Sequence, residues 1–535
     1  MSIKQSRENV FSYKKLSEIQ LWAVVGVCIA GYFLYSFFSD GFYQHDEAAH
    51  FLSMRRFWYD PNSILSNWAK PGFKLIYALP ALLGHQAVIF FNALLSGLTV
   101  YLTYKVAEEL ELNIPVLSIP LLALQPFFVQ LAFRNYSEII SALLLTLAVL
   151  LHLKNRYLLT ALVLTYLTLI RQEFYIFITL YGIYMLFKKQ WIAFILLGIG
   201  PVIYNVWGWI STGDMLYLIN SVLSTGERYS SAYPRQGFDH YFLMSNVIFG
   251  PAVVLGVVYA VSLWVRKRVQ PLWIVAIPFG LFFLMHALFN MQLIEIGSAT
   301  GGNLRYMIVI APMGAILANQ AFENAEFLKR ESIMKTVVSV IVVLTGLFMT
   351  YEHNNIMLLD QRDWIPLIMM VLLAGALWFA TTPKVMILAV SILLGLNLVL
   401  QVKPIQRSAE DKIVNRVASW MEKTNALKRP ILSNHTLLNY FLDRTKHEFP
   451  VSNQSITQKT VANAPTGTLI IWDSHYSYRP KLREGSLPYT FFTEKEQSFK
   501  TVDRFLTQER NFGILVFEKI AALPDIDNTD PSTEE

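Results

Sequence analysis

Apolar runs of about 17–25 residues recur along the chain as far as about residue 402, and they constrain the fold more than any other feature. Of the 535 residues, 54% are hydrophobic and 15% are charged, against about 45–50% and about 25% in soluble domains. A helical run of this length crosses a hydrocarbon core of about 30 Å. It must be helical, because lipid offers no hydrogen-bond partner to an exposed backbone amide or carbonyl. The sequence therefore predicts an all-α polytopic membrane protein in this region.

About thirteen membrane spans are predicted from these runs. They cover residues 20–39, 85–104, 115–132, 138–153, 157–170, 173–187, 190–210, 243–264, 271–290, 304–320, 335–351, 364–381 and 385–402. Positive charge near span ends sets the orientation, because it resists translocation. With Lys14 and Lys15 placed in the cytoplasm, the compact basic clusters of the membrane part are cytoplasmic, apart from Arg55-Arg56. We therefore expect a multi-pass protein, in a bacterial inner membrane, with a cytoplasmic N-terminus and an extracytoplasmic C-terminal domain.

A change of composition near residue 402 marks the predicted domain boundary. Residues 1–402 form the predicted membrane domain, whose first extracytoplasmic loop covers about 40–84. Residues 403–522 alternate helical and strand-like runs, which is typical of a small α/β domain. The helix is predicted at 408–427 and the strands at 430–433, 467–473 and 513–518. Asp473 and His475 end the second strand, where a turn-forming role is favoured over contact with a substrate. Residues 523–535 are acidic and are expected to be disordered.

Charge and motif content exclude several classes of partner. The net charge of +6 comes from scattered loop residues, which is not the pattern of a nucleic-acid-binding protein. No glycine-rich phosphate loop or nucleotide fingerprint is present, so no nucleotide cofactor is expected. The histidines of the membrane domain show no ligand spacing to one another. The sequence therefore predicts no particular metal site, and dependence on a divalent metal stays open.

The stretch HDEAAHF at 45–51, just after the first span, has the most informative chemical pattern. In a helix beginning there, Asp46 and His50 lie one turn apart, and Glu47 is next to Asp46. Two adjacent carboxylates can share one proton, which raises a pKa and suits one of them to act as a general base. The alternative is that Asp46 caps the helix and Glu47 favours its positive N-terminal end. Spacing alone favours this second interpretation.

Three basic residues stand at the predicted outer ends of spans. Lys70 lies in an aromatic-rich approach to the second span, and Arg171 and Arg305 each begin a span. A lysine holds a phosphate as a point charge, whereas a guanidinium binds it bidentately. Tyr306 stands next to Arg305. These positions suit recognition of a phosphate, although for Lys70 alone a lysine that snorkels to the interface is the favoured interpretation.

Charged pairs recur at the outer membrane edge and offer a second interpretation of the arginines. The pairs are Arg55 near Asp46 and Glu47, Arg134 near Glu138, Arg171 near Glu173, and Arg305 near Glu295. They are explained either as ion pairs between helices or as solvated loop ends. They are also candidates for a binding site. An ionisable group at the membrane edge costs free energy, and such groups are more often functional than those on the open protein surface.

The order of these features resembles the GT-C superfamily of membrane glycosyltransferases. It is most similar to the branch of the protein O-mannosyltransferases and the lipid A aminoarabinose transferases. That branch has one span followed by a long extracytoplasmic loop, which opens with an Asp-Glu pair as at Asp46 and Glu47. His50-Phe51 is similar to the His-Phe of the mannosyltransferases, but it lies one residue further on.

Two later motifs extend the resemblance. Lys70-Pro71 matches a Lys-Pro before the second span, with Gly72 in place of the usual second proline. Arg305-Tyr306, followed by a span that contains Pro312, matches a late Arg-Tyr motif. Each motif is short, so the resemblance rests on their order, side and topology over about 1–402.

The resemblance implies a sugar donor carried on a polyprenyl phosphate, since nucleotide sugars are not available outside the cytoplasm. It also implies a single displacement with inversion at the anomeric carbon. Asp46 is then the expected base, Glu47 a second acid or a metal-binding or orienting group, and Lys70, Arg171 and Arg305 the ligands of the donor phosphate. Further contacts to substrate are expected from His50, Arg55, Arg134, Glu138 and Tyr306. The implied partners are the lipid-linked sugar, membrane lipid, and an acceptor hydroxyl on a protein, lipid or glycan.

Two other classes of protein fit part of the pattern. A transporter or flippase for a lipid-linked sugar would share the spans and the phosphate ligands, but it needs charged groups accessible from both faces. A scaffold protein of the cell envelope would need no charges at the membrane edge. The formation of a glycosidic bond distinguishes the glycosyltransferase from both.

Overall fold

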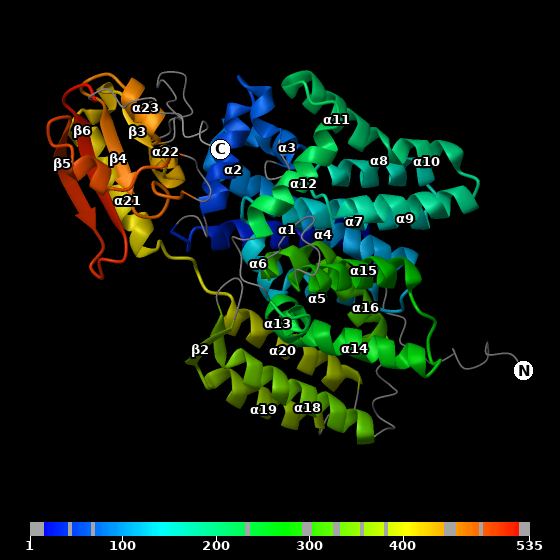
Figure 1. Cartoon of the computed structure of the whole chain (residues 1–535). Coiled ribbons are helices and arrows are strands. Elements are labelled where there is room, and N and C mark those ends of the chain that lie inside the picture. The colour runs from blue at the N-terminus through cyan, green and yellow to red at the C-terminus, as the bar shows by residue number, and fades with distance from the viewer. Residues whose placement is uncertain are drawn as a thin grey trace, which may run out of the picture. The chain divides into compact units, whose positions relative to one another are not determined.

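The computed structural model describes residues 15–40, 45–65, 70–230, 236–291, 302–324, 332–353, 358–378, 383–442, 456–480 and 485–523. Within these ranges the chain is mostly helical, with a four-stranded sheet near the C-terminal end (Figure 1). It divides into two compact units. The helical unit comprises Met1–Ser39 and Phe57–Pro404, and the mixed unit comprises Asp40–Arg56 and Ile405–Glu535. Glu295 and the predicted tail from residue 524 onward lie outside the described residues.

The helical unit consists of helices joined by short turns, with one short hairpin. The α-helices are α1 (Glu18–Ser36), α3 (Pro71–Leu82), α4 (His85–Glu109), α5 (Ser118–Ala123), α6 (Pro126–Leu131), α7 (Ser137–Leu153), α8 (Tyr157–Thr168), α9 (Phe174–Phe187), α10 (Trp191–Leu197), α11 (Ile199–Thr212), α12 (Tyr217–Ser230), α13 (His240–Ile248), α14 (Pro251–Val265), α15 (Trp273–Asn290), α16 (Ala311–Glu323), α18 (Ser332–Met349), α19 (Ile365–Trp378) and α20 (Pro383–Gln401). The 3₁₀ helices are η2 (Pro61–Ile64), η3 (Pro115–Leu117) and η4 (Leu304–Ile310), and the hairpin pairs β1 (Tyr351–His353) with β2 (Leu358–Arg362).

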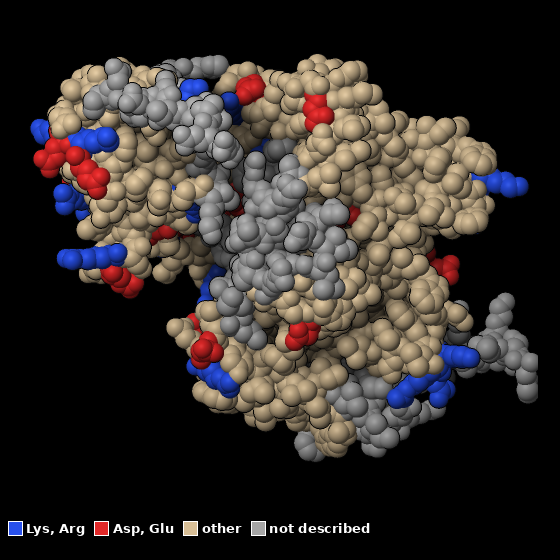
Figure 2. Space-filling view, viewed as in Figure 1, with Lys and Arg blue, Asp and Glu red and all other residues tan. Residues whose placement is uncertain are grey.

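Several of these helices have the length and composition of membrane spans. Among the described residues, α1, α4, α15 and the continuous pair α10–α11 are long and apolar enough to cross a membrane. Seven further apolar helices of 10–17 residues accompany them, α7, α8, α9 and α14 among them. Large apolar side chains are exposed on α8, α9 and α10, and charged side chains are sparse over these helices on the face shown in Figure 2. The multi-pass helical membrane fold predicted from the sequence is therefore confirmed.

Proline and glycine break some of the predicted spans into shorter helices. The predicted span 243–264 is α13 and α14, which are divided by Gly250, with φ +82°, and Pro251. The predicted span 115–132 is likewise divided, and Pro126 begins its last helix, α6. Proline has no amide hydrogen to donate and clashes with the preceding turn, so it suits the start of a helix rather than its interior. At such breaks, some backbone amides and carbonyls have no partner within the helix, so polar groups lie inside the helical unit.

The mixed unit is built on a four-stranded sheet. Its elements are α2 (His45–Arg56), α21 (Ala409–Lys423), η5 (Ala426–Lys428), β3 (Ile431–Ser433), α22 (Thr436–Phe441), α23 (Gln458–Asn463), β4 (Leu469–Asp473), α24 (Thr490–Thr493), β5 (Phe499–Leu506) and β6 (Gly513–Lys519). The strand order is β3-β4-β6-β5; β3 and β4 are parallel, and the other two pairs are antiparallel. The amphipathic helix and the three strands predicted here are confirmed, and β5 is an additional strand.

Alternating side chains of the sheet build two cores, one on each face. Ile471 of β4 and Val516 of β6 pack with α21 and α22. Ile470 and Trp472 of the same strand β4 pack on the opposite side, in a cluster with Phe492. Ala48 of α2 belongs to the first of these cores, and α2 packs against α22. The short helix from the first predicted loop is therefore part of the mixed unit.

Candidate functional sites

A buried cluster of charged side chains forms the candidate site of the helical unit. Breaks and ends of helices position its members: Lys70 precedes α3, Glu138 lies in the first turn of α7, Arg171 and Glu173 lie between α8 and α9, and Arg305 lies in η4. These stretches are distant in sequence, so the cluster forms only when the helices pack together. We call these five residues the basic cluster.

Ion pairs connect the two arginines to the two carboxylates. Arg171 Nη1 lies 2.9 Å from Glu138 Oε1, and Arg171 Nη2 lies 2.6 Å from Glu173 Oε1. Arg305 Nε lies 3.5 Å from the same Glu138 oxygen. The side chains of Arg171 and Glu138 are 2% and 0% exposed, so water and salt screen these interactions little. The Arg171–Glu173 ion pair offered as an alternative interpretation of the sequence is present.

The basic cluster carries an excess of positive charge. Three cations face two carboxylates, so one positive charge is not neutralised within the cluster. Lys70 Nζ donates a hydrogen bond to Ser137 Oγ at 2.9 Å. Burial lowers the pKa of Lys70 to about 8, and the nearby Glu138 opposes this shift. A buried site with one excess positive charge favours binding of an anion.

Aromatic rings fix the planes of the two guanidinium groups. Arg171 Cζ lies 4.6 Å from the centroid of the Tyr306 ring, and Arg305 Cζ lies 4.2 Å from that of Tyr136. These distances are those of cation–π contacts, which restrict a guanidinium to a plane. His286, in the middle of α15, has Nε2 at 3.5 Å from Glu173 Oε1. Tyr136 and His286 were not predicted; an ionisable residue inside an apolar helix was the available signal for His286.

The structure brings together six of the residues singled out in the sequence, namely Lys70, Glu138, Arg171, Glu173, Arg305 and Tyr306. Arg134 is also buried, and its guanidinium lies 5.5 Å from the centroid of the neighbouring Phe133 ring. Its role as a contact to substrate stays a prediction.

The predicted catalytic carboxylates lie on α2, in the mixed unit. Asp46 and Glu47 occupy the first turn of this helix; Asp46 is half-buried, and Glu47 is 2% exposed. His50, one turn further on, is also 2% exposed. The guanidinium of Arg55 lies 5.7 Å from the Phe51 ring. A helix does begin at the HDEAAHF stretch, but its first residue is His45, so Asp46 lies within the first turn and not at the capping position. There the carboxylates of Asp46 and Glu47 both favour the positive N-terminal end of the helix.

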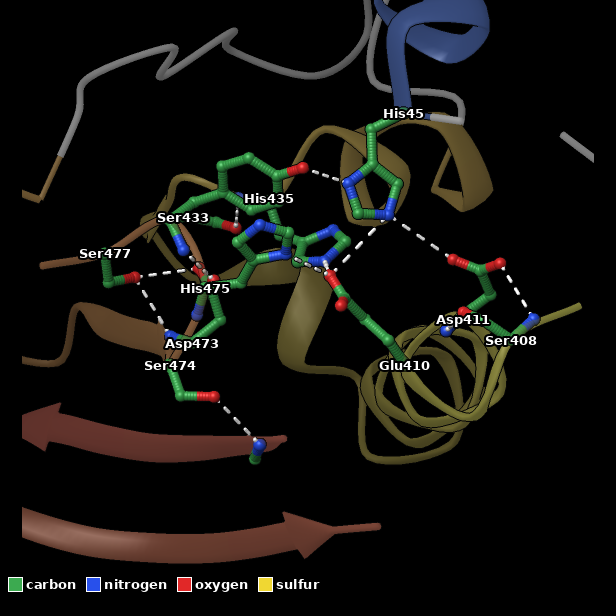
Figure 3. Close-up of polar contacts among 12 residues, drawn as sticks. His45, Ser408, Glu410, Asp411, Ser433, His435, Asp473, Ser474, His475 and Ser477 are labelled. Carbon is green, nitrogen blue, oxygen red and sulfur yellow. Dashed lines mark hydrogen bonds and ion pairs between the residues drawn. The ribbon is translucent and has the colours of Figure 1, made fainter. Parts of the chain in front are cut away.

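A second cluster, of histidines and carboxylates, lies within the mixed unit (Figure 3). It contains His45 from the start of α2, Glu410 and Asp411 from α21, His435 from the loop after β3, and His475 from the turn after β4. We call it the histidine–carboxylate cluster. Glu410 Oε1 is its centre: it lies 3.0 Å from His435 Nε2, 2.9 Å from His475 Nδ1 and 3.6 Å from His45 Nε2.

Local structure holds the carboxylates and histidines of this cluster in place. Ser408 and Asp411 form a capping box that starts α21, so Glu410 lies in the first turn. Asp473 accepts hydrogen bonds from the backbone amide of His475 and the hydroxyl of Ser477, which is the turn-forming role favoured from the sequence. Burial alone would raise the pKa of the Glu410 carboxyl, but hydrogen bonds from His435 and His475 hold it well below its usual range.

Comparison with known proteins relates the whole chain to one membrane fold. No protein-family model matches the chain, and no curated protein matches it in sequence. The crystal structure of ArnT from Cupriavidus metallidurans bound to undecaprenyl phosphate is similar at a TM-score of 0.59 and 11% identity. The apo structure of the same protein is similar at a TM-score of 0.55 and 13% identity, and each match covers 95% of this chain and 100% of the other. ArnT is a lipid A aminoarabinose transferase of the GT-C superfamily, so the resemblance seen in the sequence is confirmed at the level of the fold.

Proposed function

We propose that this protein is an inverting glycosyltransferase that moves a hexose or pentose from a polyprenyl-phosphate donor to an extracytoplasmic acceptor hydroxyl. The observation that supports it most is the basic cluster, a buried cationic site within a helical membrane unit. The fold adds support, because ArnT, which has the same fold, was solved with undecaprenyl phosphate bound. The acceptor hydroxyl belongs to a protein, lipid or glycan of the cell envelope.

The charge of the basic cluster suits the change in charge of such a donor. A sugar linked to a polyprenyl phosphate is a phosphodiester with one negative charge, equal to the excess positive charge of the cluster. Cleavage at the anomeric carbon releases a phosphate monoester, which carries about 1.5 to 2 negative charges at neutral pH. Cations that are already in place stabilise this growing charge without reorganisation, so the departure of the phosphate is accelerated.

Each member of the basic cluster has a distinct part in this proposal. Lys70 supplies a point charge, and Arg171 and Arg305 supply planar donors for the phosphate oxygens. Glu138 contacts both guanidinium groups and Glu173 contacts that of Arg171, so both groups are oriented before the donor binds. The ion pairs in the cluster are thus compatible with phosphate binding, because two carboxylates cannot neutralise three cations.

We propose Asp46 as the base that takes the proton of the acceptor hydroxyl, with Glu47 beside it as a second acid. This assignment rests on the order of motifs in the sequence, where the Asp-Glu pair opens the first loop after the first span. His50, Arg55 and Arg134 are proposed contacts to the sugar or acceptor.

Transfer is tested with the purified full-length protein in detergent. Synthetic polyprenyl-phosphate sugars, radiolabelled in the sugar, are incubated with an envelope fraction from cells that lack the protein. The expected result is label in an acceptor, release of polyprenyl phosphate, and a product with inverted anomeric configuration. Recovery of all the donor intact would refute the transferase. Movement of intact donor across proteoliposomes would instead identify a flippase.

The proposed orientation places the N-terminus in the cytoplasm and the mixed unit outside, in a bacterial inner membrane. It is tested by labelling intact cells with an impermeant maleimide. A Ser474→Cys change in a Cys28→Ser background presents a thiol at an exposed position after β4. Labelling of intact cells is expected, and labelling only after lysis would reverse the orientation.

A further inference from the structure

The histidine–carboxylate cluster brings together groups that ordinarily bind a metal ion. One ligand atom each from His45, Glu410 and His435 lies within 4.8 Å of the others. His435 Nε2 and His45 Nε2 lie 3.0 Å and 3.6 Å from Glu410 Oε1. Zinc binds such atoms at about 2.0–2.2 Å in tetrahedral geometry, so neighbouring ligand atoms lie about 3.3–3.5 Å apart. The two separations from Glu410 bracket this value.

We propose that His45, Glu410 and His435 bind one divalent transition-metal ion of the zinc class. Two imidazoles and one carboxylate are a ligand set that zinc uses, with a fourth position left for water or another ligand. Imidazole nitrogens select zinc and its first-row neighbours over magnesium and calcium, which prefer oxygen ligands. The site lies wholly within the mixed unit and does not depend on the proposed glycosyl transfer.

Surrounding residues orient the ligands as outer partners do in metal sites. The Nδ1 atom of His45 contacts the hydroxyl of Tyr476, which leaves its Nε2 directed toward Glu410 and Asp411. His475 Nδ1 lies 2.9 Å from Glu410 Oε1, within hydrogen-bond distance of the carboxylate. Such partners fix the tautomer of a ligating histidine and raise the basicity of the ligands. The side chain of His435 is 0% exposed, so that ligand is shielded from water.

Hydrogen bonds explain the position of His45 poorly. Its Nε2 atom lies 3.4 Å from Asp411 Oδ1 and 3.6 Å from Glu410 Oε1. Both distances exceed the roughly 2.7–3.2 Å of an ordinary hydrogen bond from nitrogen to oxygen. A metal ion bound to His45 Nε2, Glu410 and His435 would give this nitrogen a partner at bonding distance.

Binding of a metal here would connect the two stretches of sequence that form the mixed unit. His45 is the first residue of α2, whereas Glu410 and His435 follow the last helix of the helical unit. The ion would therefore fix the first turn of α2 against α21. This turn also contains Asp46, so metal binding would order the segment that carries the proposed base.

Metal content of the purified protein tests the proposal. Full-length protein with a tag that contains no histidine is treated with chelator, incubated with Zn²⁺ and desalted, and its zinc is measured by mass spectrometry. We expect about one zinc per chain, because a three-ligand site retains zinc through desalting. Wild-type protein that retains no zinc would overturn the site.

Ligand variants locate the ion. Glu410→Gln and His45→Ala should each weaken zinc affinity by more than the 10–100-fold typical of an outer partner. Glu422→Gln, the same change at an exposed position of the same helix, should alter it less than about twofold. Both side chains are half-buried, at 19% exposure for His45 and 20% for Glu410, so both variants should fold. The unfolding temperature of each variant with chelator should match that of chelated wild-type protein, and Zn²⁺ should raise only the wild-type value. Wild-type affinity in both ligand variants would overturn the assignment, whatever the transfer assay shows.

Discussion

The two charged clusters of this protein are made of different chemical groups. In the basic cluster of the helical unit, the guanidinium groups of Arg171 and Arg305 keep their protons at any physiological pH and pair with buried carboxylates. In the histidine–carboxylate cluster of the mixed unit, the basic groups are imidazoles, whose nitrogens can ligate metals.

The difference indicates opposite kinds of ligand. Permanent cations with one charge in excess favour an anion, whereas imidazole nitrogens grouped around a carboxylate are ligands for a metal cation. If this comparison holds, variants of one cluster should change one kind of binding and leave the other unchanged. The expected effects run from a loss of turnover to a modest dependence on pH.

The largest effect is expected at Asp46, which lies next to a metal ligand but is not one of the proposed three. Asp46→Asn should lower turnover by about 10²–10⁴-fold, since an amide cannot act as a general base. The amide keeps the size of the carboxylate and loses only its charge interaction with the helix N-terminus, worth about 0.3–1 kcal/mol, so the unfolding temperature should stay near that of wild type. Zinc content and donor affinity should also be unchanged. The measurement is the initial rate with a radiolabelled donor, and near-normal turnover would show that Asp46 is not the base.

Arg171 should matter most for the stability of the helical unit. Arg171→Met leaves Glu138 and Glu173 buried without their main partner, and loss of one member of a buried ion pair costs about 3–5 kcal/mol. The unfolding temperature in detergent should fall, with zinc content intact. A second change, Glu173→Gln, should restore part of the lost unfolding temperature, because it removes one of the two buried charges left without their main partner. A wild-type unfolding temperature for Arg171→Met would show that these ion pairs do not stabilise the fold.

Lys70 and Arg305 should contribute to donor affinity rather than to metal binding. Each charged hydrogen bond to a phosphate is worth about 1.5–3 kcal/mol, so Lys70→Ala and Arg305→Ala should each weaken binding at least about tenfold. Arg362→Ala, at an exposed arginine of the same unit, is the control and should change it less than about twofold. Binding is measured with a fluorescent polyprenyl phosphate. Unchanged affinity in both variants would remove the shared phosphate site.

The smallest effect is a pH dependence due to Lys70, whose pKa is lowered to about 8 by burial. The ammonium is charged below this pH and binds the phosphate, and it becomes neutral above it. Donor affinity should therefore decrease as pH rises from 7 to 9, and Lys70→Ala or Lys70→Arg should abolish the decrease. Wild-type affinity that stays constant over this range would contradict the assignment of Lys70.

Hydrophobic patterning predicted the helices well and their interruptions poorly. Every predicted span contains at least one helix, because runs of apolar residues are visible over about 20 positions. The break at Gly250-Pro251 depends on two residues inside one such run and was not predicted. Strand β5 was missed because it is an edge strand paired only with β6, and it carries exposed charged residues such as Lys500. It lacks the apolar run by which β4 and β6 were recognised.

The sequence indicates the basic cluster more clearly than it indicates the histidine–carboxylate cluster. Arg171 and Arg305 stand at the edges of apolar runs, where a charge is costly and therefore conspicuous. The proposed metal ligands do not stand at the edges of apolar runs, and no short ligand spacing connects them. His45 precedes most of the helical unit, whereas Glu410 and His435 follow it. Only the packing of α2 within the mixed unit brings them together.

The membership of α2 in the mixed unit has a consequence for biosynthesis. The ribosome completes residues 40–56 early, but the remainder of that unit begins roughly 350 residues later. At about 5–20 residues per second, α2 waits about 20–70 s for the chain against which Ala48 and Phe51 pack. During that interval the helix exposes an apolar face with nothing to cover it. A nascent chain stalled before residue 405 should therefore be a substrate for chaperones and proteases at a segment near its beginning, although most of its helices are already synthesised.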